Sequence, residues 1–254
     1  MKTVTIDIGN TCSKVDVWTD EGFLCRHSSG PLNVEEIVGM GERENVEAYI
    51  VSSVRKDSGE AVRQLKEKSK CPVVVFDNDE IERYYSSIEY KGKLGPDRLA
   101  AVLGADLIYP GVAKMVVDLG TAMTIDIADS QGNFCGGNIS LGLFSRMKAL
   151  AQATSKLPDI KEIGEGKIFG DDTASAISSG ALAGVVGEIL YSFLKAREKF
   201  GVKVGILTGG DAGYVEREVM DTLGGINDPY LVGRGLDYHL RTRRLHPPVG
   251  GVEK

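Results

Sequence analysis

The chain has 254 residues, of which 42% are hydrophobic and 26% are charged. This composition is ordinary for a globular protein, and the length suffices for one large domain or two smaller ones. The 36 acidic residues outnumber the 30 Lys and Arg residues, which gives a net charge of −6 and excludes the overall positive field that attracts nucleic acid. We expect no membrane-spanning helix and no secretory leader, because neither apolar pattern is evident in the sequence.

The cysteines and histidines do not form a recognisable metal-binding pattern. The four cysteines are scattered, and none belongs to a Cys-x-x-Cys pair. A chain of this length does not need disulfides, and the spacing does not match a zinc site. We therefore predict free thiols in a reducing cytoplasm.

Residues 3–28 and 114–139 share one pattern. Each stretch has a β-branched run that ends in Asp-x-Gly, with Asp7 and Asp118 as the acids, followed by a Thr and an alternating segment. Alternation bounded by Gly, Asn and Asp is typical of strands joined by tight turns. Asn10 is an insertion in the first copy. The pattern favours a duplicated α/β unit over chance similarity between two hairpins.

Apolar periodicity predicts helices between and after the two copies. The expected helices are 60–70, 98–109, 144–157, 173–200, 211–223 and 231–243. Pro110-Gly111 is a turn pair directly before the second copy. The sequence therefore predicts an N-terminal domain over 1–111 and a C-terminal domain over 112–254.

The two Asp-x-Gly turns carry groups that suit phosphate binding. In the first, Asp7 ends a strand, Gly9 admits close approach to the backbone, and Thr11 adds a hydroxyl. A carboxylate there suits Mg²⁺, which prefers oxygen ligands and bound phosphates. The turn at Asp118 repeats these groups, so a pair could grip a polyphosphate from both sides. Taken singly, each turn also reads as an ordinary hairpin.

Two further segments have both a structural and a functional interpretation. Gly209-Gly210 leads into Asp211. In the functional interpretation, the two glycines let a flat ring lie against the backbone. In the structural interpretation, Asp211 is the cap of a helix. In Gly95-Pro96-Asp97-Arg98, Asp97 would cap the helix that begins at Arg98. Alternatively, Asp97 would accept a proton from a substrate hydroxyl while Arg98 pairs with an anionic group.

Taken in order, these four segments resemble the type III pantothenate kinases. That family belongs to the superfamily of acetate and sugar kinases, heat-shock chaperones and actin. The resemblance implies an α/β fold of duplicated ribonuclease H-like, actin-like ATPase domains with an ATP cleft between them. It also implies ATP-dependent phosphorylation of pantothenate to 4'-phosphopantothenate, the first step of coenzyme A biosynthesis, by a homodimer with the substrate site at the subunit interface.

The same resemblance assigns roles to particular residues. Asp97 would be the proton acceptor, Asp118 would bind a monovalent cation (K⁺ or NH₄⁺), and Asp7 would lie near Mg²⁺. The implied ATP-binding residues are Asp7, Ile8, Gly9, Asn10, Thr11, Cys12, Ser13, Lys14 and Thr121. The implied pantothenate-binding residues are Tyr90, Gly95, Pro96, Asp97, Arg98 and Thr173, although Thr173 also reads as a helix cap.

The chain departs from the family pattern at two places. The segment between Tyr90 and Gly95 is short and lacks an Asn-Pro pair, and Pro96 stands where Ala is frequent. Two other functions stay open: a non-catalytic regulator on the same scaffold, and a kinase for a sugar or another small hydroxy compound. The three retained acids favour catalysis, and the net charge disfavours direct DNA binding.

Overall fold

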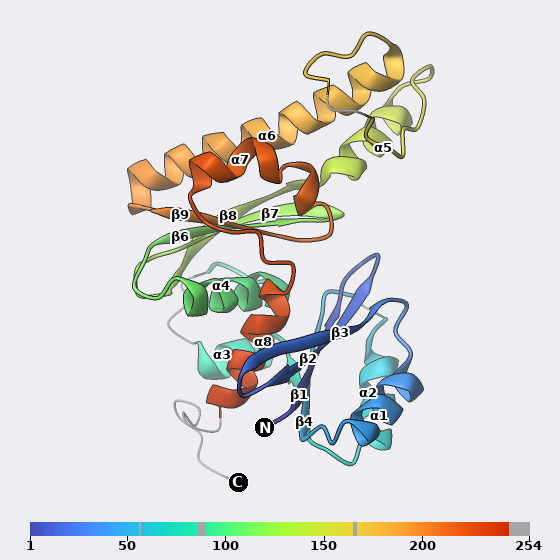
Figure 1. The fold of residues 1–254 in the computed structure, drawn as a ribbon, viewed down its shortest axis with the longest axis vertical. Coiled ribbons are helices and arrows are strands. Elements are labelled where there is room, and N and C mark those ends of the chain that lie inside the picture. Colours follow the sequence, from blue (N-terminus) through green and yellow to red (C-terminus); the bar gives the residue numbers. More distant parts are fainter. Residues whose placement is uncertain (56, 86–89, 165–166, 244–254) are drawn as a thin grey trace. The chain divides into compact units, whose positions relative to one another are not determined.

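The computed structural model describes residues 1–55, 57–85, 90–164 and 167–243. They divide into two units (Figure 1): Met1–Ile108 together with residues 230–243, and Tyr109–Pro229. The predicted division after residue 111 falls close to the first break. The assignment of everything from 112 to 254 to one domain is corrected, because the last helix packs in the first unit.

The first unit is built on a five-stranded mixed sheet with the order β3-β2-β1-β4-β5. β1 pairs antiparallel with β2 and parallel with β4. Side chains alternate along β1: Val4 and Ile6 enter an apolar core, while Thr5 and Asp7 face the opposite side. The strands are β1 (Thr3–Ile8), β2 (Ser13–Thr19), β3 (Gly22–Gly30), β4 (Ala48–Ser53) and β5 (Val73–Phe76).

Helices cover both faces of this sheet. The helices are α1 (Val34–Arg43), α2 (Gly59–Lys68), α3 (Asn78–Tyr84), α4 (Pro96–Ile108) and α8 (Leu231–Thr242). α1 and α2 pack on the apolar face through residues such as Ile37 and Leu65. α8 covers the more polar face, where Gly233 lies against Thr5 and Trp18. In Figure 1, α8 lies with the strands of the N-terminal part although it is last in the sequence.

The second unit repeats the core of the first. Its sheet has the order β8-β7-β6-β9, which matches β3-β2-β1-β4 strand for strand. α6 and α7 pack on its apolar face. The elements are β6 (Lys114–Leu119), β7 (Ala122–Ala128), β8 (Phe134–Leu141), α5 (Leu143–Ala153), α6 (Thr173–Phe200), β9 (Val204–Thr208), the short 3₁₀ helix Ala212–Tyr214 and α7 (Glu216–Leu223). The predicted duplication is therefore confirmed.

α6 is the one helix of the described residues whose length and composition would allow it to cross a membrane. Its most apolar 18-residue window has a mean hydropathy of 1.5, and 28% of that window is buried. This corrects the expectation that the chain holds no such stretch. One such helix is weak support for a membrane span, and α6 places Val185, Ile189 and Phe193 in the core of the second unit.

Candidate active site

The first Asp-x-Gly turn is a tight connection between β1 and β2. The Gly9 amide donates to the Cys12 carbonyl at 3.1 Å, and a Cβ added at Gly9 would lie 2.9 Å from that same oxygen. Only glycine therefore fits without a shift of the turn. Asp7 is half-buried at the end of β1, and Asn10 and Thr11 are exposed. The turn thus presents a carboxylate and exposed polar groups together.

Two basic residues lie beside this turn. Lys14 of β2 is the register partner of Asp7, so both side chains share one face of the sheet. Arg55 lines an open hollow with Asn10, and its guanidinium is held by Asp57 through hydrogen bonds of 2.9 and 2.6 Å. The sequence reading missed Arg55, because nothing in one sequence shows that the segment after β4 returns to this turn.

The second turn, between β6 and β7, is closed by a similar hydrogen bond, but the loop that this bond spans is one residue shorter. The Gly120 amide donates to the Ala122 carbonyl at 3.0 Å, which agrees with the predicted insertion in the first copy. The start of α5 supports the turn: the Ser145 hydroxyl donates to the Thr121 carbonyl at 2.7 Å, and the Gly142 amide donates to it at 3.1 Å. These two hydrogen bonds fix the backbone of Thr121, and the residue is exposed.

The Gly-Gly-Asp segment closes against the second turn. Gly209 has a φ of +97°, and a Cβ added there would lie 2.6 Å from Asp118 Oδ1, so glycine is required on both counts. The Asp211 amide donates to the Leu119 carbonyl at 2.9 Å. Burial and the nearby Asp118 charge raise the pKa of the Asp211 carboxyl. Asp211 occupies the N-cap position of the 3₁₀ helix, as predicted, but its side chain makes no capping hydrogen bond to that helix.

The two turns offer oxygen donors for cations. Among the described residues, no group of three or more His, Cys, Asp or Glu side chains could hold a metal ion. The single carboxylate of Asp7 therefore suits Mg²⁺ only if water and phosphate supply the other ligands, as Mg²⁺ usually requires. At the second turn, the Asp118 carboxylate, the Leu119 carbonyl and the nearby Asp211 carboxyl make the local potential negative.

The predicted substrate segment forms the start of α4. The helix begins at Pro96, so the predicted start at Arg98 with Asp97 as its cap is wrong. Pro is favoured at the first helical position because its missing N–H has no helical partner there. The half-buried Asp97 carboxylate accepts from the Arg98 amide at 2.9 Å. Asp97 thus stands in the first turn of α4, at the helix end that favours negative charge.

Arg98 and Tyr90 are brought together, as the prediction of a common site requires. The Arg98 side chain is buried, and its Nη1 donates to the Tyr90 hydroxyl at 3.3 Å. The guanidinium carbon lies 5.7 Å from the centroid of the Tyr90 ring. The short segment between Tyr90 and Gly95 is therefore compatible with contact between the tyrosine and the arginine.

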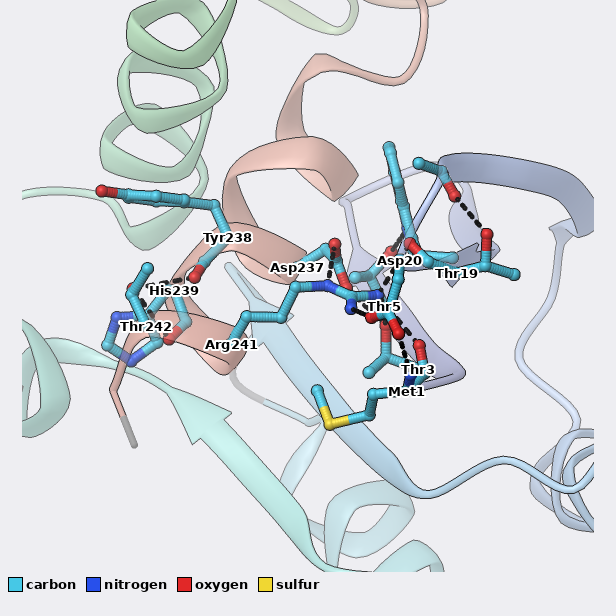
Figure 2. Close-up of polar contacts among 12 residues, drawn as sticks. Met1, Thr3, Thr5, Thr19, Asp20, Asp237, Tyr238, His239, Arg241 and Thr242 are labelled. Atoms are coloured by element: carbon cyan, nitrogen blue, oxygen red, sulfur yellow. Dashed lines mark hydrogen bonds and ion pairs between the residues drawn. The ribbon is translucent and has the colours of Figure 1, made fainter. Parts of the chain in front are cut away.

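α4 packs tightly against α8. The two helices approach so closely that a Cβ added at Gly104 would lie 2.3 Å from the Leu231 carbonyl oxygen. Figure 2 shows how α8 is fixed to the N-terminal strands: Arg241 donates to Asp237 at 2.7 Å, to the Thr19 carbonyl at 3.0 Å, and to Asp20. The position of Asp97 therefore depends on the C-terminal helix, which the sequence reading had assigned to the other domain.

A second set of contacts joins α8 to α3. The His239 ring is buried, and its Nε2 lies 3.0 Å from the Glu80 carboxylate while its Nδ1 lies 2.9 Å from the Tyr85 hydroxyl. Arg243 Nε lies 3.1 Å from the same carboxylate. Burial raises the pKa of Glu80, but the His239 hydrogen bond and the charges of Arg243, His239 and Arg83 outweigh it and lower the pKa below its usual value.

Thr173 lies in the second unit, at the first position of α6. Asp172 caps this helix by accepting from the Ser175 amide at 2.7 Å, and the Ser175 hydroxyl completes a capping box. The interpretation of Thr173 as the capping residue is therefore wrong. The Thr173 side chain is exposed. Its substrate-binding role stays a prediction.

The fold defines an α/β protein of the actin-like ATPase and sugar kinase class. A solved structure from Campylobacter jejuni, described as a conserved Baf family transcriptional activator, covers 95% of this chain and 99% of its own, with a TM-score of 0.60 and 22% identity. An N-acetylmannosamine kinase structure from Listeria monocytogenes covers 96% of this chain and 100% of its own, with a TM-score of 0.58 and 14% identity. At these identities the likeness shows the fold alone, and it confirms the predicted fold class.

The sequence comparisons go further than the fold. The family model for type III pantothenate kinase matches residues 3–193. A type III pantothenate kinase from Bacteroides fragilis is 32% identical over 232 residues, which is 91% of this chain and 94% of that protein. One from Azobacteroides pseudotrichonymphae is 34% identical over 236 residues, 92% of this chain and 94% of that protein. The chain belongs to the type III pantothenate kinase family.

Proposed function

We propose that this protein transfers the γ-phosphoryl group of ATP to the hydroxyl group of pantothenate in the cytoplasm. The product would be 4'-phosphopantothenate, and the reaction the first step of coenzyme A biosynthesis. One observation carries the proposal: the family match over residues 3–193 includes both Asp-x-Gly turns and the Gly-Pro-Asp-Arg segment.

Asp97 is the proposed proton acceptor. Its carboxylate accepts a hydrogen bond from the pantothenate hydroxyl and orients the oxygen toward the γ-phosphorus. It takes the proton as the new P–O bond forms and the bond from the γ-phosphorus to the β–γ bridging oxygen breaks, which releases ADP. The Arg98 amide holds the carboxylate from one side, which limits its rotation. The Arg98 guanidinium, steadied by Tyr90, pairs with the pantothenate carboxylate. Gly95 and Pro96 shape the turn before them, and Thr173 is the proposed further substrate contact.

Residues 7–14 and Thr121 are the proposed ATP-binding residues. Among them, the hydroxyl of Thr11 can donate to a phosphate, and Lys14 adds positive charge. Mg²⁺ near Asp7 would neutralise part of the negative charge of the phosphates. K⁺ or NH₄⁺ near Asp118 would neutralise part of the negative charge of the Asp118 and Asp211 carboxylates. Gly209 and Gly210 provide a flat backbone surface for adenosine.

A homodimer is part of the proposal. Several large apolar side chains of the second unit are exposed on α6 and on the neighbouring α5. They are Tyr191 at 64%, Leu194 at 51% and Leu150 at 40% exposed. Exposed apolar side chains on adjacent elements are a sign of a protein interface. We name these three residues the α6 surface and propose that it pairs with a second copy of this chain.

The test is ADP release by the purified protein with ATP, Mg²⁺ and K⁺. Pantothenate should support release, while sugars and acetate should not. If a sugar is the better substrate, the fold is right and the proposed substrate is wrong. The description of the Campylobacter structure favours one other function, that of a transcriptional regulator. DNA mobility-shift assays with the same preparation separate the two, because the kinase proposal expects no shifted band.

A further inference from the structure

The hydroxyl group of Ser52 is buried without a hydrogen-bond partner. Ser52 is 0% exposed in β4, and its Oγ is among the three side-chain polar atoms of the described residues that are buried and unpaired. A buried hydroxyl that makes no hydrogen bond costs stability, and alanine would occupy the same place without that cost. The position of Ser52 therefore needs a reason other than packing.

The neighbour of Ser52 in the sheet is Asp7. β1 and β4 are parallel, and Ser52 is the register partner of Asp7. Residues directly opposite one another in adjacent strands project from the same face of a sheet. The other residues of the two strands agree with this placement. Val4 of β1 and Val51 of β4 enter the core beneath α1 and α2. Because side chains alternate along a strand, Asp7 and Ser52 lie on the opposite face of the sheet.

The second unit repeats this arrangement. Thr208 of β9 is the register partner of Asp118 in β6, the strands are again parallel, and Thr208 is 1% exposed. Each Asp-x-Gly acid thus has a buried hydroxyl residue at the same place in the neighbouring strand. The unpaired serine and the repeated register are independent observations, since one concerns a hydrogen bond and the other the topology.

We infer that Ser52 and Thr208 are positioning residues, which donate a hydrogen bond to the carboxylates of Asp7 and Asp118 when the nucleotide and its cations are bound. The inference rests on the proposed function, because it takes these acids as the groups that face the cations. A carboxylate that is held by a neighbouring hydroxyl keeps one orientation toward a cation, as second-sphere hydrogen bonds do at metal sites. Neither residue is expected to touch the substrate.

The test of Ser52 uses nucleotide binding and needs no turnover. The dissociation constant of ATP should be measured by calorimetry with and without Mg²⁺ for the whole protein and for Ser52→Ala. We expect affinity with Mg²⁺ to fall about tenfold, affinity without Mg²⁺ to stay the same, and the melting temperature to stay equal or rise. Equal affinity with Mg²⁺, or a variant that melts lower or fails to fold, would show a structural hydroxyl and overturn the inference.

A matched control is Ser178→Ala, which removes a buried serine hydroxyl that already donates to the Ser175 carbonyl at 3.1 Å. This variant should melt at a lower temperature and keep the Mg²⁺ effect on ATP binding. If its Mg²⁺ effect falls as much as that of Ser52→Ala, loss of any buried hydroxyl accounts for the result and the inference is wrong.

Thr208 is tested with Thr208→Val, which has the same shape without the hydroxyl, and with Thr208→Ser, which retains it. The K⁺ concentration that gives half of the full ATP affinity should rise about tenfold in Thr208→Val and return to the original value in Thr208→Ser. Failure of the serine variant to restore it would contradict the role of the hydroxyl. Because these readouts are binding equilibria, a wild-type protein that binds ATP but leaves pantothenate unchanged would overturn the proposed function and not this inference.

Discussion

Gly235 of α8 lies so close to Ala100 of α4 that a Cβ added at the glycine would stand 1.8 Å from the alanine carbonyl oxygen. No side chain fits between the two helices at this point. α4 carries Asp97 and Arg98 at its start, so the closeness of the helices sets where these two side chains lie. A C-terminal glycine therefore takes part in placing the proposed proton acceptor.

Replacement of Asp97 by asparagine should lower kcat for pantothenate about 100-fold to 10,000-fold, because the amide cannot accept the proton. ATP binding should persist, since the nucleotide is held elsewhere. The measurement is steady-state ADP release together with calorimetric ATP binding. Asp106→Asn, the same change near the other end of α4, is the control and should keep kcat. Unchanged turnover by a folded Asp97→Asn protein would remove Asp97 from its role.

Sodium should fail to replace potassium in the reaction. The site at Asp118 offers a carboxylate, a carbonyl and a nearby second carboxylate, and the expected ligands are K⁺ or NH₄⁺. ADP release should be compared in buffers that contain only K⁺, only NH₄⁺ or only Na⁺. Asp118→Asn should remove the difference between the buffers. Full activity in Na⁺ alone would argue against a monovalent cation at Asp118.

The Glu80–His239 contact should make stability fall in acid. The pKa of Glu80 in the folded state is lowered from its ordinary value of 4.5, so the ionised carboxylate stabilises the protein above that pH. This contribution is lost as the pH falls through the folded-state pKa. Glu80→Gln should lose about 1–3 kcal/mol at pH 7, and its deficit relative to the wild type should shrink in acid.

Urea unfolding at several pH values between 7 and the acid limit of the folded protein measures this deficit. Glu67→Gln is the control, because Glu67 is exposed and pairs only at the surface with Arg63. A Glu80→Gln deficit that stays constant across the pH range would show that the carboxylate charge does not stabilise the fold.

Arg241→Met should destabilise the first unit by about 2–3 kcal/mol, because Asp237 would be left largely buried without its guanidinium partner. The contacts that are lost are those of Arg241 in Figure 2, to Asp237, Asp20 and the Thr19 carbonyl. Thermal and urea unfolding measure the effect. Arg63→Met, which breaks an exposed pair on α2, should change stability by less than about 1 kcal/mol. Similar losses in both variants would contradict an anchoring role for Arg241.

A charge on the α6 surface should abolish the proposed homodimer. Leu194→Glu places a carboxylate among exposed apolar side chains, where a partner would have to bury it. Light scattering after size exclusion should report a monomer, while circular dichroism should remain that of the folded chain. Glu198→Gln, on the same helix but outside the α6 surface, is the control and should remain a dimer. A dimeric Leu194→Glu protein would place the interface elsewhere.

The duplication and the positions of the two acids could be predicted from the sequence because both rest on local signals. Asp-x-Gly after a β-branched run marks a strand end, and in the structure the strands end one residue after Asp7 and Asp118, at Ile8 and Leu119. The helix over Thr173–Phe200 was also predicted correctly from its long run of small and apolar residues, although its cap is Asp172 and not Thr173.

The sequence could not show which parts pack together. Arg55 lies beside the first turn only because β4 runs parallel to β1, and that pairing has no local signal. The helix from Leu231 onward follows the second sheet in the chain, so proximity in sequence assigned it to the wrong unit. α4 was predicted to begin at Arg98 because aspartate is a frequent cap, but Pro96 already has the backbone angle of a helix and starts it two residues earlier.

The return of α8 to the first sheet has a consequence for the order of assembly on the ribosome. Residues Tyr109–Pro229 form one uninterrupted stretch and are complete once they have emerged. The N-terminal strands, although synthesised first, wait for the final helix to cover one of their faces. The half of the molecule that is made earlier should therefore be the later one to reach its native state, contrary to the usual vectorial sequence.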